Sequence, residues 1–368
     1  MPRAADVPEV LVVGAGPVGL LLAGELRCAG AGVTVVDRLA QPMQESRAAQ
    51  LTSRTAELLH DRGLDALLAE AGHEPRAHFG GLGFELADVD SAFAGHWKVP
   101  QYRTEAALAE RALGLGATLL REHELTGLTE HEDHVEAAFA GRPVLRADFV
   151  VGCDGRHSAV RRLAGFAVDS APATRELLRA DVTGLDVPDR RFERFEHGMA
   201  VASTRAGVTR VMVHEFGPEV THEQPTFETV AETWAKVTGE DISHGTPVWV
   251  DAFDNSRGQA TEYRRGRVFL AGDAARWHLP IGGQALNVGL QDAVGLGRRF
   301  RPGESLDGYH DERHAAGAET LRHAVAQEDL LLGGPDVGPL RAVLAELLEL
   351  PQVRSHLTAL LSGVRSSA

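Results

Sequence analysis

Cysteine and lysine are both scarce in this sequence. Its 368 residues include 2 cysteines, Cys28 and Cys153, and the apolar residues around each predict buried, reduced thiols and no disulfide framework. Lys98 and Lys236 are the only lysines, a bias toward arginine that we attribute to coding preference. The patterns CxxC, GxSxG and GxxxxGK followed by Ser or Thr are missing too, which excludes the usual thiol-redox, hydrolase and P-loop signatures.

Positive charge is also in short supply. The chain has 37 Lys and Arg against 52 Asp and Glu, a formal net charge of −15, which argues against a nucleic acid or an anionic membrane as partner. No basic N-terminal segment leads into an apolar run with a cleavage site, so we expect a soluble, cytoplasmic protein. Hydrophobic residues make up 43% of the chain. At this length, that content allows a large core in two or more domains.

The N-terminal segment has the pattern of a dinucleotide-binding turn. Apolar residues 10–13 predict a buried parallel strand, and a helix is predicted over residues 20–29. Between them stand the glycines of a GxGxxG pattern, Gly14, Gly16 and Gly19. The next predicted strand, 33–36, ends in Asp37, where a carboxylate can accept hydrogen bonds from a ribose. A glycine turn can also serve packing alone, but the strand, helix and acid together favour a dinucleotide whose pyrophosphate lies at the helix N-terminus.

A second segment, LAGDAARWHLPIGGQALNVGLQDA at 270–293, favours FAD over NAD. A short apolar strand at 268–270 leads to Gly272 and Asp273, and a new helix is predicted from about Ala285. Backbone N–H groups at the start of that helix would face an anion or a carbonyl, which suits a flavin ring whose reduced form is negative. The alternative is a plain strand–turn–helix without a ligand.

A third buried strand, at 149–152, ends in Cys153, Asp154 and Gly155. With these three segments the chain resembles the single-component FAD-dependent aromatic hydroxylases of the para-hydroxybenzoate hydroxylase fold, the class A flavoprotein monooxygenases. It is most similar to the branch that acts on aromatic polyketides, with rifampicin-type monooxygenases as relatives. The resemblance runs from Val10 to about Gly363. It rests on GAGPVGLLLAGEL, ESRA, VPQYRTEAAL, GCDGRHSAVRRLAG, the GDAA segment and YHDERHAAGA.

The resemblance implies an α/β fold in which a Rossmann-like FAD-binding domain is interleaved with an α+β substrate domain that carries an antiparallel sheet. We assign residues 1–72, 99–170 and 262–300 to the first domain, 73–98 and 171–261 to the second, and 301–368 to C-terminal helices. Within the second domain we predict strands at 178–182, 199–203, 209–216 and 247–253 and a helix at 226–237. The thioredoxin-like third domain of many polyketide hydroxylases is expected to be missing.

The resemblance also implies which residues contact the cofactor. Expected FAD contacts are Gly14, Gly16, Pro17, Gly19, Asp37, Arg38, Arg47, Gln101, Asp154, Gly272, Asp273, Pro280, Gly282, Gly283, Ala285, Leu286 and Asn287. Of these, Arg47, Pro280, Gly282 and Gly283 are expected to contribute to catalysis, because the 280–287 turn would stabilise negative charge on the flavin and exclude water. No His or Cys is poised for a flavin bond, so the FAD should be non-covalent.

The expected chemistry is oxygen activation. NADPH would bind transiently, since no second GxGxxG exists for it, and would reduce a mobile flavin; oxygen would then form a flavin C4a-hydroperoxide that hydroxylates a small polycyclic aromatic. No metal is expected, because His310 and His314, although spaced i,i+4, lack a third ligand. Neither the substrate nor the choice between monomer and homodimer follows from the sequence.

Three positions depart from the family pattern. Arg276 stands where a histidine is common, Ala285 replaces a glycine, and His157 replaces an arginine. A methyl group at 285 would crowd the flavin, and Arg276 would place a fixed charge near it. Three functions therefore stay open: an aromatic hydroxylase, a flavoprotein with structural FAD that catalyses a non-redox cyclisation or rearrangement, and a non-catalytic binding protein.

Overall fold

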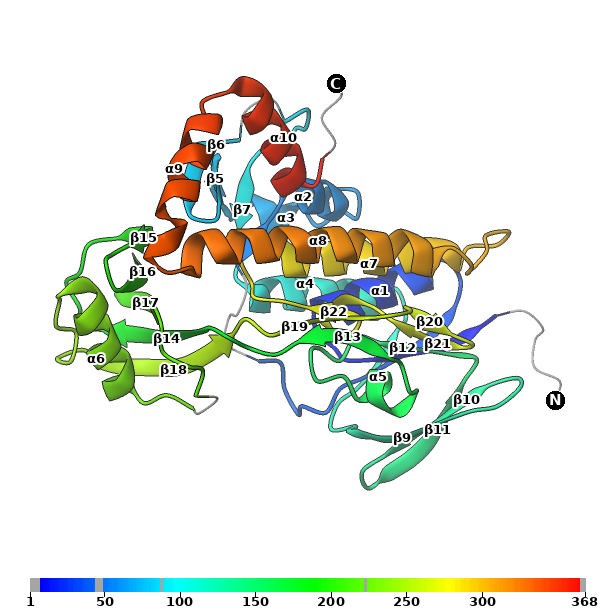
Figure 1. The fold of residues 1–368 in the computed structure, drawn as a ribbon. Helices are drawn as coiled ribbons and strands as arrows, with labels where there is room; N and C mark the ends of the chain where they lie inside the picture. The colour runs from blue at the N-terminus through cyan, green and yellow to red at the C-terminus, as the bar shows by residue number, and fades with distance from the viewer. Residues whose placement is uncertain (1–6, 44–48, 87–88, 222–223, 365–368) are drawn as a thin grey trace.

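The computed structural model describes residues 7–43, 49–86, 89–221 and 224–364. The long helix α8 (Tyr309–Leu332) runs across the middle of the molecule, and an antiparallel sheet packs near its C-terminal end (Figure 1). Within the described residues, no helix combines the length and apolar character that a membrane span requires.

The parallel sheet has six strands, and its helices pack on it. Its order is β20 (Arg264–Arg265), β21 (Val268–Leu270), β12 (Phe149–Gly152), β1 (Glu9–Val13), β2 (Gly32–Val36) and β8 (Thr118–Leu120). Every neighbouring pair is parallel except β20 with β21. The helices α1 (Pro17–Cys28), α4 (Gln101–Gly114) and α7 (Gln284–Arg299) pack against one another through α1. Apolar residues on both faces of these strands are buried, as expected for a covered parallel sheet.

The antiparallel sheet has five strands and two different faces. Its order is β15 (Arg190–Arg194), β16 (Gly198–Arg205), β17 (Val208–Glu215), β14 (Glu176–Thr183) and β18 (Thr246–Asp254). On one face, side chains such as Ala180 and Val211 pack around Trp234 of α6 (Phe227–Thr238). On the other face, alternate residues such as Leu177 and Met199 form an apolar cluster with α8. The mixed α/β fold with an antiparallel sheet is therefore confirmed.

Three smaller three-stranded sheets and one hairpin complete the strands of the described residues. The three-stranded sheets are β11 (Arg142–Ala147) with β10 (Val135–Phe139) and β9 (Leu125–Glu130); β13 (Val168–Ala171) with β19 (Arg257–Ala260) and β22 (Arg276–Trp277); and β3 (Gln50–Leu51) with β7 (His96–Lys98) and β4 (Gly72–Glu74). The hairpin is β5 (Arg76–Phe79) with β6 (Leu82–Glu85). The domain boundaries given above stay a prediction.

The described residues contain five further helices and two 3-10 turns. They are α2 (Ser53–His60), α3 (Asp65–Ala69), α5 (Ala159–Leu163), α9 (Gly338–Leu347) and α10 (Pro351–Ser362), with 3-10 turns η1 (Gly272–Ala274) and η2 (Pro335–Val337). Helices α9 and α10 stand over the β5–β6 hairpin and share a small apolar core with it (Figure 1). The expectation of two buried thiols was wrong for Cys28, which is exposed at the end of α1, where the helix turns toward solvent; Cys153 is half-buried.

Candidate active site

The carboxyl ends of four adjacent parallel strands meet at one edge of the six-stranded sheet. Asp37 follows β2, Gly14 follows β1, Cys153 follows β12 and Ala271 follows β21. Ligands in open α/β sheets bind outside this edge. The three segments singled out in the sequence therefore lie together in the structure.

The first turn, residues 14–19, contains three glycines that differ in the space available for a side chain. Gly14 has φ of +107°, and a Cβ there would lie 2.4 Å from the carbonyl oxygen of Cys153. A Cβ on Gly19 would lie 2.0 Å from the carbonyl oxygen of Gly14, so both glycines are required by packing. Beside Gly16, in contrast, a Cβ would meet nothing within 4 Å. Gly16 is also the N-cap of α1 and supplies no side-chain hydrogen bond, which leaves an open helix N-terminus suited to an anion.

Asp37 holds the same turn together. One carboxylate oxygen accepts the N–H of Ala15 at 2.7 Å, and the other accepts the N–H of Leu39 at 2.8 Å. The side chain is half-buried, and each oxygen retains further acceptor capacity. Asp37 thus organises the turn in addition to any bond that it makes with a ligand.

Asp154 is engaged at the start of α5. Its carboxylate accepts hydrogen bonds from the Ser158 hydroxyl at 2.5 Å and from the N–H groups of Ala159 and Val160 at 2.7 and 3.1 Å. Burial raises the pKa of Asp154, and these hydrogen bonds oppose the shift. The guanidinium of Arg161, on α5, donates to the Ala274 carbonyl at 2.9 Å. This hydrogen bond connects the Asp154 loop to residues 272–283, the second turn.

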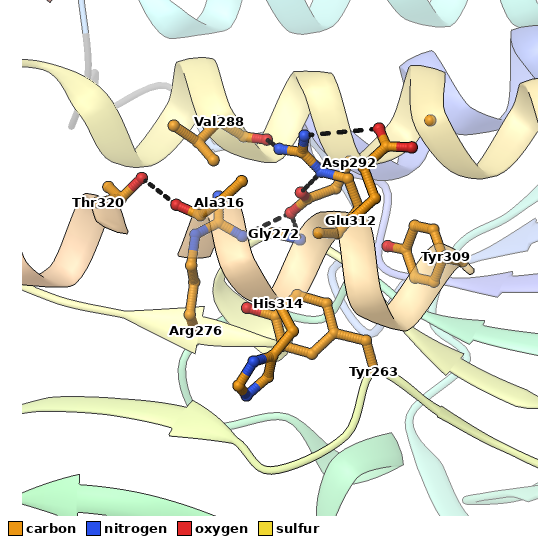
Figure 2. A network of polar contacts seen from close by, with 12 residues as sticks. Tyr263, Gly272, Arg276, Val288, Asp292, Tyr309, Glu312, His314, Ala316 and Thr320 are labelled. Atoms are coloured by element: carbon orange, nitrogen blue, oxygen red, sulfur yellow. Dashed lines mark hydrogen bonds and ion pairs between the residues drawn. The ribbon is translucent and has the colours of Figure 1, made fainter. Parts of the chain in front are cut away.

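Asp292 of α7 anchors the second turn through its carboxylate, which points toward Gly272 and Arg276 (Figure 2). It is fully buried and accepts the N–H of Gly272 at 3.0 Å. Two buried arginines complete its coordination: Arg276 donates from Nη1 at 2.6 Å and Arg313 of α8 donates from Nε at 2.7 Å. Charged hydrogen bonds of this kind are strong, and here they join β22, α7 and α8.

Arg276, expected from the sequence to place a fixed charge near the flavin, is buried and ion-paired within the protein. Its side chain points into the protein and pairs with Asp292 (Figure 2). Burial lowers the pKa of Arg276, but the neighbouring carboxylate more than offsets this and the pKa is raised. An arginine is long enough to reach this buried partner, which lies on the helix sixteen residues later in the chain, so its charge is balanced by Asp292; the effect of Arg276 on the flavin stays a prediction.

The turn before α7 is built on two glycines in the left-handed region. Gly282 has φ of +68° and Gly283, the N-cap of α7, has φ of +70°. Asn287 is fully buried and fixes this turn, since its amide donates to the carbonyls of Gly283 and Gln50 and accepts the N–H of Thr52. The backbone N–H groups at the start of α7 have no side-chain cap.

The two turns contact each other directly. A Cβ on Gly272 would lie 3.1 Å from Val18, the second residue of α1, and a Cβ on Gly289 would lie 2.9 Å from the same side chain. Asp273 projects from the second turn with an exposed side chain, and the protein around it raises its pKa by desolvation against the attraction of Arg276. An open helix N-terminus and an exposed carboxylate thus lie beside one another.

Comparison with known proteins identifies this arrangement. A family model described as an FAD binding domain matches residues 8–324. Rifampicin monooxygenase of Streptomyces venezuelae is 36% identical over 97% of this chain and 78% of its own length. The chain belongs to the family of FAD-dependent aromatic monooxygenases.

Two further members show the breadth of this monooxygenase family. The crystal structure of CabE, an aromatic hydroxylase from angucycline biosynthesis, has a TM-score of 0.91 and 42% identity and covers 97% of this chain and 76% of its own. Dialkyldecalin synthase of Streptomyces rugosporus is 35% identical over 97% of this chain and 80% of its own length. Membership of the family therefore establishes the FAD-binding fold, and the reaction has to be argued from the site.

The residues of this family member fit FAD at the observed edge. The open space beside Gly16 at an uncapped helix start suits the pyrophosphate, and Asp37 and Asp273 stand at either side of it. Leu286 and Ala285 are half-buried in the first turn of α7, Pro280 is exposed before it, and Pro17 is the first residue of α1.

Other expected contacts are less directly placed. Arg38 is exposed next to Asp37, and Gln101 opens α4 and donates to Glu105 at 2.7 Å. His157 is exposed after the Asp154 loop. Arg47 lies outside the described residues. The roles of all these residues toward FAD stay predictions.

Sequence reasoning missed the residues that hold the second turn. Asp292, Arg313 and Gln50 were not proposed as site residues, although Asp292 stands in the quoted segment. A single acid among the small and apolar residues of VGLQDAVGLG is a signal for a buried, paired carboxylate. Its partners could not be read from spacing because they lie on other elements.

Proposed function

We propose that this protein is an FAD-dependent monooxygenase that uses NADPH and molecular oxygen to hydroxylate a polycyclic aromatic substrate of the polyketide type. The observation that carries the proposal is the convergence of the first and second turns at Val18, where the open helix N-terminus and Asp273 lie together. Relatives named for rifampicin and for angucycline biosynthesis support an aromatic, polyketide-derived substrate.

Bound FAD would supply the reduction by NADPH and the activation of oxygen. The contribution of the chain is to bind and orient. Gly16 and the α1 N-terminus would take the pyrophosphate, and Asp37 and Asp273 would accept hydroxyl hydrogen bonds. The uncapped N–H groups at Gly283 and the following residues would stabilise negative charge and, with the apolar side chain of Ile281 beside them, exclude water.

A second function is favoured by the names of some relatives. Dialkyldecalin synthase, at 35% identity, shows that a member of the family carries the name of a ring-forming enzyme. On that reading FAD would be structural and the cavity would catalyse a non-redox cyclisation. The pairing of Arg276 with Asp292 favours the hydroxylase over this alternative, because the unusual arginine is accommodated by a buried carboxylate of the protein.

Product formation distinguishes the two functions. Purified protein loaded with FAD would be supplied with NADPH, air and a panel of polycyclic phenols, with NADPH consumption followed by absorbance and products by mass spectrometry. We expect at least one phenol to accelerate NADPH oxidation and to gain the mass of one oxygen atom. NADPH oxidation that no phenol stimulates, with no oxygenated product, would contradict the proposal.

A further inference from the structure

Lys98 is connected to the Gly282–Gly283 turn by a chain of hydrogen bonds. Lys98 ends β7, the strand between β3 and β4, and its side chain is half-buried. Its Nζ donates to Oε1 of Gln50 at 2.5 Å, and Nε2 of Gln50 donates to the Gly282 carbonyl at 3.4 Å. A Cβ on Gly283 would lie 2.7 Å from the same Gln50 nitrogen. Two consecutive hydrogen bonds, through the Gln50 amide, therefore connect the ammonium group to the turn before α7, where the flavin is expected.

Among the described residues, no carboxylate forms an ion pair with the Lys98 ammonium, whose hydrogen-bond acceptor is the Gln50 amide. Glu74 of β4 is the carboxylate whose charge acts on it, but that group is engaged by Arg191 at 3.0 Å and by the N–H of Arg76 at 3.0 Å. Arg191 of β15 and Arg205 of β16 add like charge from the antiparallel sheet. Desolvation and these arginines lower the pKa of Lys98 to about 8.

The remaining titratable groups nearby do not neutralise the ammonium. His96 on β7 and His78 on β5 are buried, and desolvation lowers their pKa values to about 4 and about 3, so both are neutral at pH 7. A half-buried cation among like charges is unfavourable unless an anion arrives to pair with it. The geometry thus calls for an anionic ligand.

An apolar wall and a second polar group border the same turn. Ile281 and Leu279 belong to a cluster with Met199 of the antiparallel sheet and Leu331 of α8. Gln327 of α8 is fully buried beside Gly282, and neither atom of its amide has a hydrogen-bond partner in the described chain. These apolar side chains are themselves buried, so they form a packed support behind the turn, and the unpartnered amide of Gln327 is the polar group within it.

We propose that Lys98, positioned by Gln50, recognises an ionised phenolic oxygen of the aromatic substrate and so selects substrates that carry an acidic hydroxyl. The phenol loses its proton to solvent on binding, and the phenolate oxygen accepts a hydrogen bond from the Lys98 ammonium. This inference rests on the proposed function and deepens it. The sequence alone assigns no role to Lys98, because we attribute the scarcity of lysine to coding preference.

The test is ligand binding to oxidised holoenzyme without NADPH, so that no turnover occurs. The probes are 1,8-dihydroxyanthraquinone and its dimethyl ether, titrated while the flavin absorbance is recorded. Wild type should bind the phenol more tightly than the ether. Lys98→Met should weaken phenol binding about 10- to 100-fold, the range for a hydrogen bond to a charged group, and leave ether binding unchanged.

Two further variants and one condition complete the design. Lys236→Met, which removes an exposed lysine on α6, is the matched control and should behave as wild type. Lys98→Arg should retain part of the phenol preference, and it serves as the test if Lys98→Met does not fold. In wild type the preference should be lost at a pH above the pKa values of both the phenol and Lys98, where the phenolate is formed but the ammonium has lost its proton.

Two results would overturn the inference. One is a wild type that does not distinguish the phenol from the ether. The other is a folded, FAD-loaded Lys98→Met that keeps the full preference. Failure of the proposed function has a different signature, because a protein that prefers the phenol but is never reduced by NADPH would retain the Lys98 site and lose the monooxygenase activity.

Discussion

The first and second turns hold the same cofactor site by different means. The first turn, residues 14–19, is defined by backbone: two glycines fit where no Cβ can, and Asp37 ties the loop through main-chain N–H groups. The second turn, residues 272–283, is held by side chains, above all by Asp292 between two buried arginines. The difference teaches that an added Cβ should disturb the first turn most, whereas loss of a buried charge should disturb the second turn most.

Removal of the Asp292 carboxylate should have the largest effect. Asp292→Ala leaves Arg276 and Arg313 buried without their anion, and breaking a buried ion pair in this way costs about 3–5 kcal/mol. Urea unfolding of apoprotein should show this loss in the free energy of unfolding. Asp311→Ala, which removes an acid with 86% exposure on α8, is the control and should cost less than about 0.5 kcal/mol. Equal stability of the two variants would refute the anchoring role.

The glycines should separate folding from binding in the first turn. Gly14→Ala places a Cβ against the Cys153 carbonyl in a backbone region that alanine avoids. The free energy of unfolding should therefore fall by about 1–3 kcal/mol. Gly16→Ala meets no protein atom and should leave the stability of apoprotein unchanged within about 0.5 kcal/mol. It should nevertheless weaken FAD binding, measured by fluorescence titration. Unweakened binding by Gly16→Ala would remove the pyrophosphate from this position.

Asp37→Ala should have an intermediate effect. The variant leaves the N–H groups of Ala15 and Leu39 without their acceptor and removes the expected ribose contact, so FAD affinity should fall by about 1–3 kcal/mol. Asp37→Asn keeps one acceptor oxygen and should lose less. Titration of the apoprotein measures both, and an Asp37→Ala variant with wild-type affinity would exclude Asp37 from the site.

The second turn should contribute a measurable pH dependence to stability. Desolvation lowers the pKa of His278 to about 4, so the folded protein holds this side chain neutral while the unfolded chain protonates it near pH 6.5. Its contribution to stability is complete above pH 6.5 and is lost as the pH falls toward 4, by about 1.4 kcal/mol per pH unit. Unfolding measured at pH 7 and pH 5 should show a smaller acid loss in His278→Gln than in wild type. His356→Gln, at an exposed position of α10, is the control.

The same contrast explains how much could be predicted from sequence. The strand, glycines and Asp37 of the first turn follow from local spacing. So do four of the five strands of the antiparallel sheet, which begin and end within two residues of the predicted bounds; the edge strand β15 was not predicted. The partners of the second turn do not follow from local spacing. Gln50 and Gly282 are 232 positions apart, and the direction of Arg276 depends on helices that pack behind it. Local patterns carry backbone geometry, whereas buried side-chain networks depend on the tertiary fold.

Anaerobic reduction of the bound flavin tests the central claim most directly. Holoenzyme would be mixed with NADPH in a stopped-flow instrument without oxygen, with and without 1,8-dihydroxyanthraquinone, and the visible flavin absorbance followed. The account predicts bleaching by NADPH that the phenol accelerates, because the charge of Arg276 is balanced by Asp292 within the protein. Flavin that dithionite reduces but NADPH does not, even with a phenol demonstrably bound, would contradict it and favour a structural role for FAD.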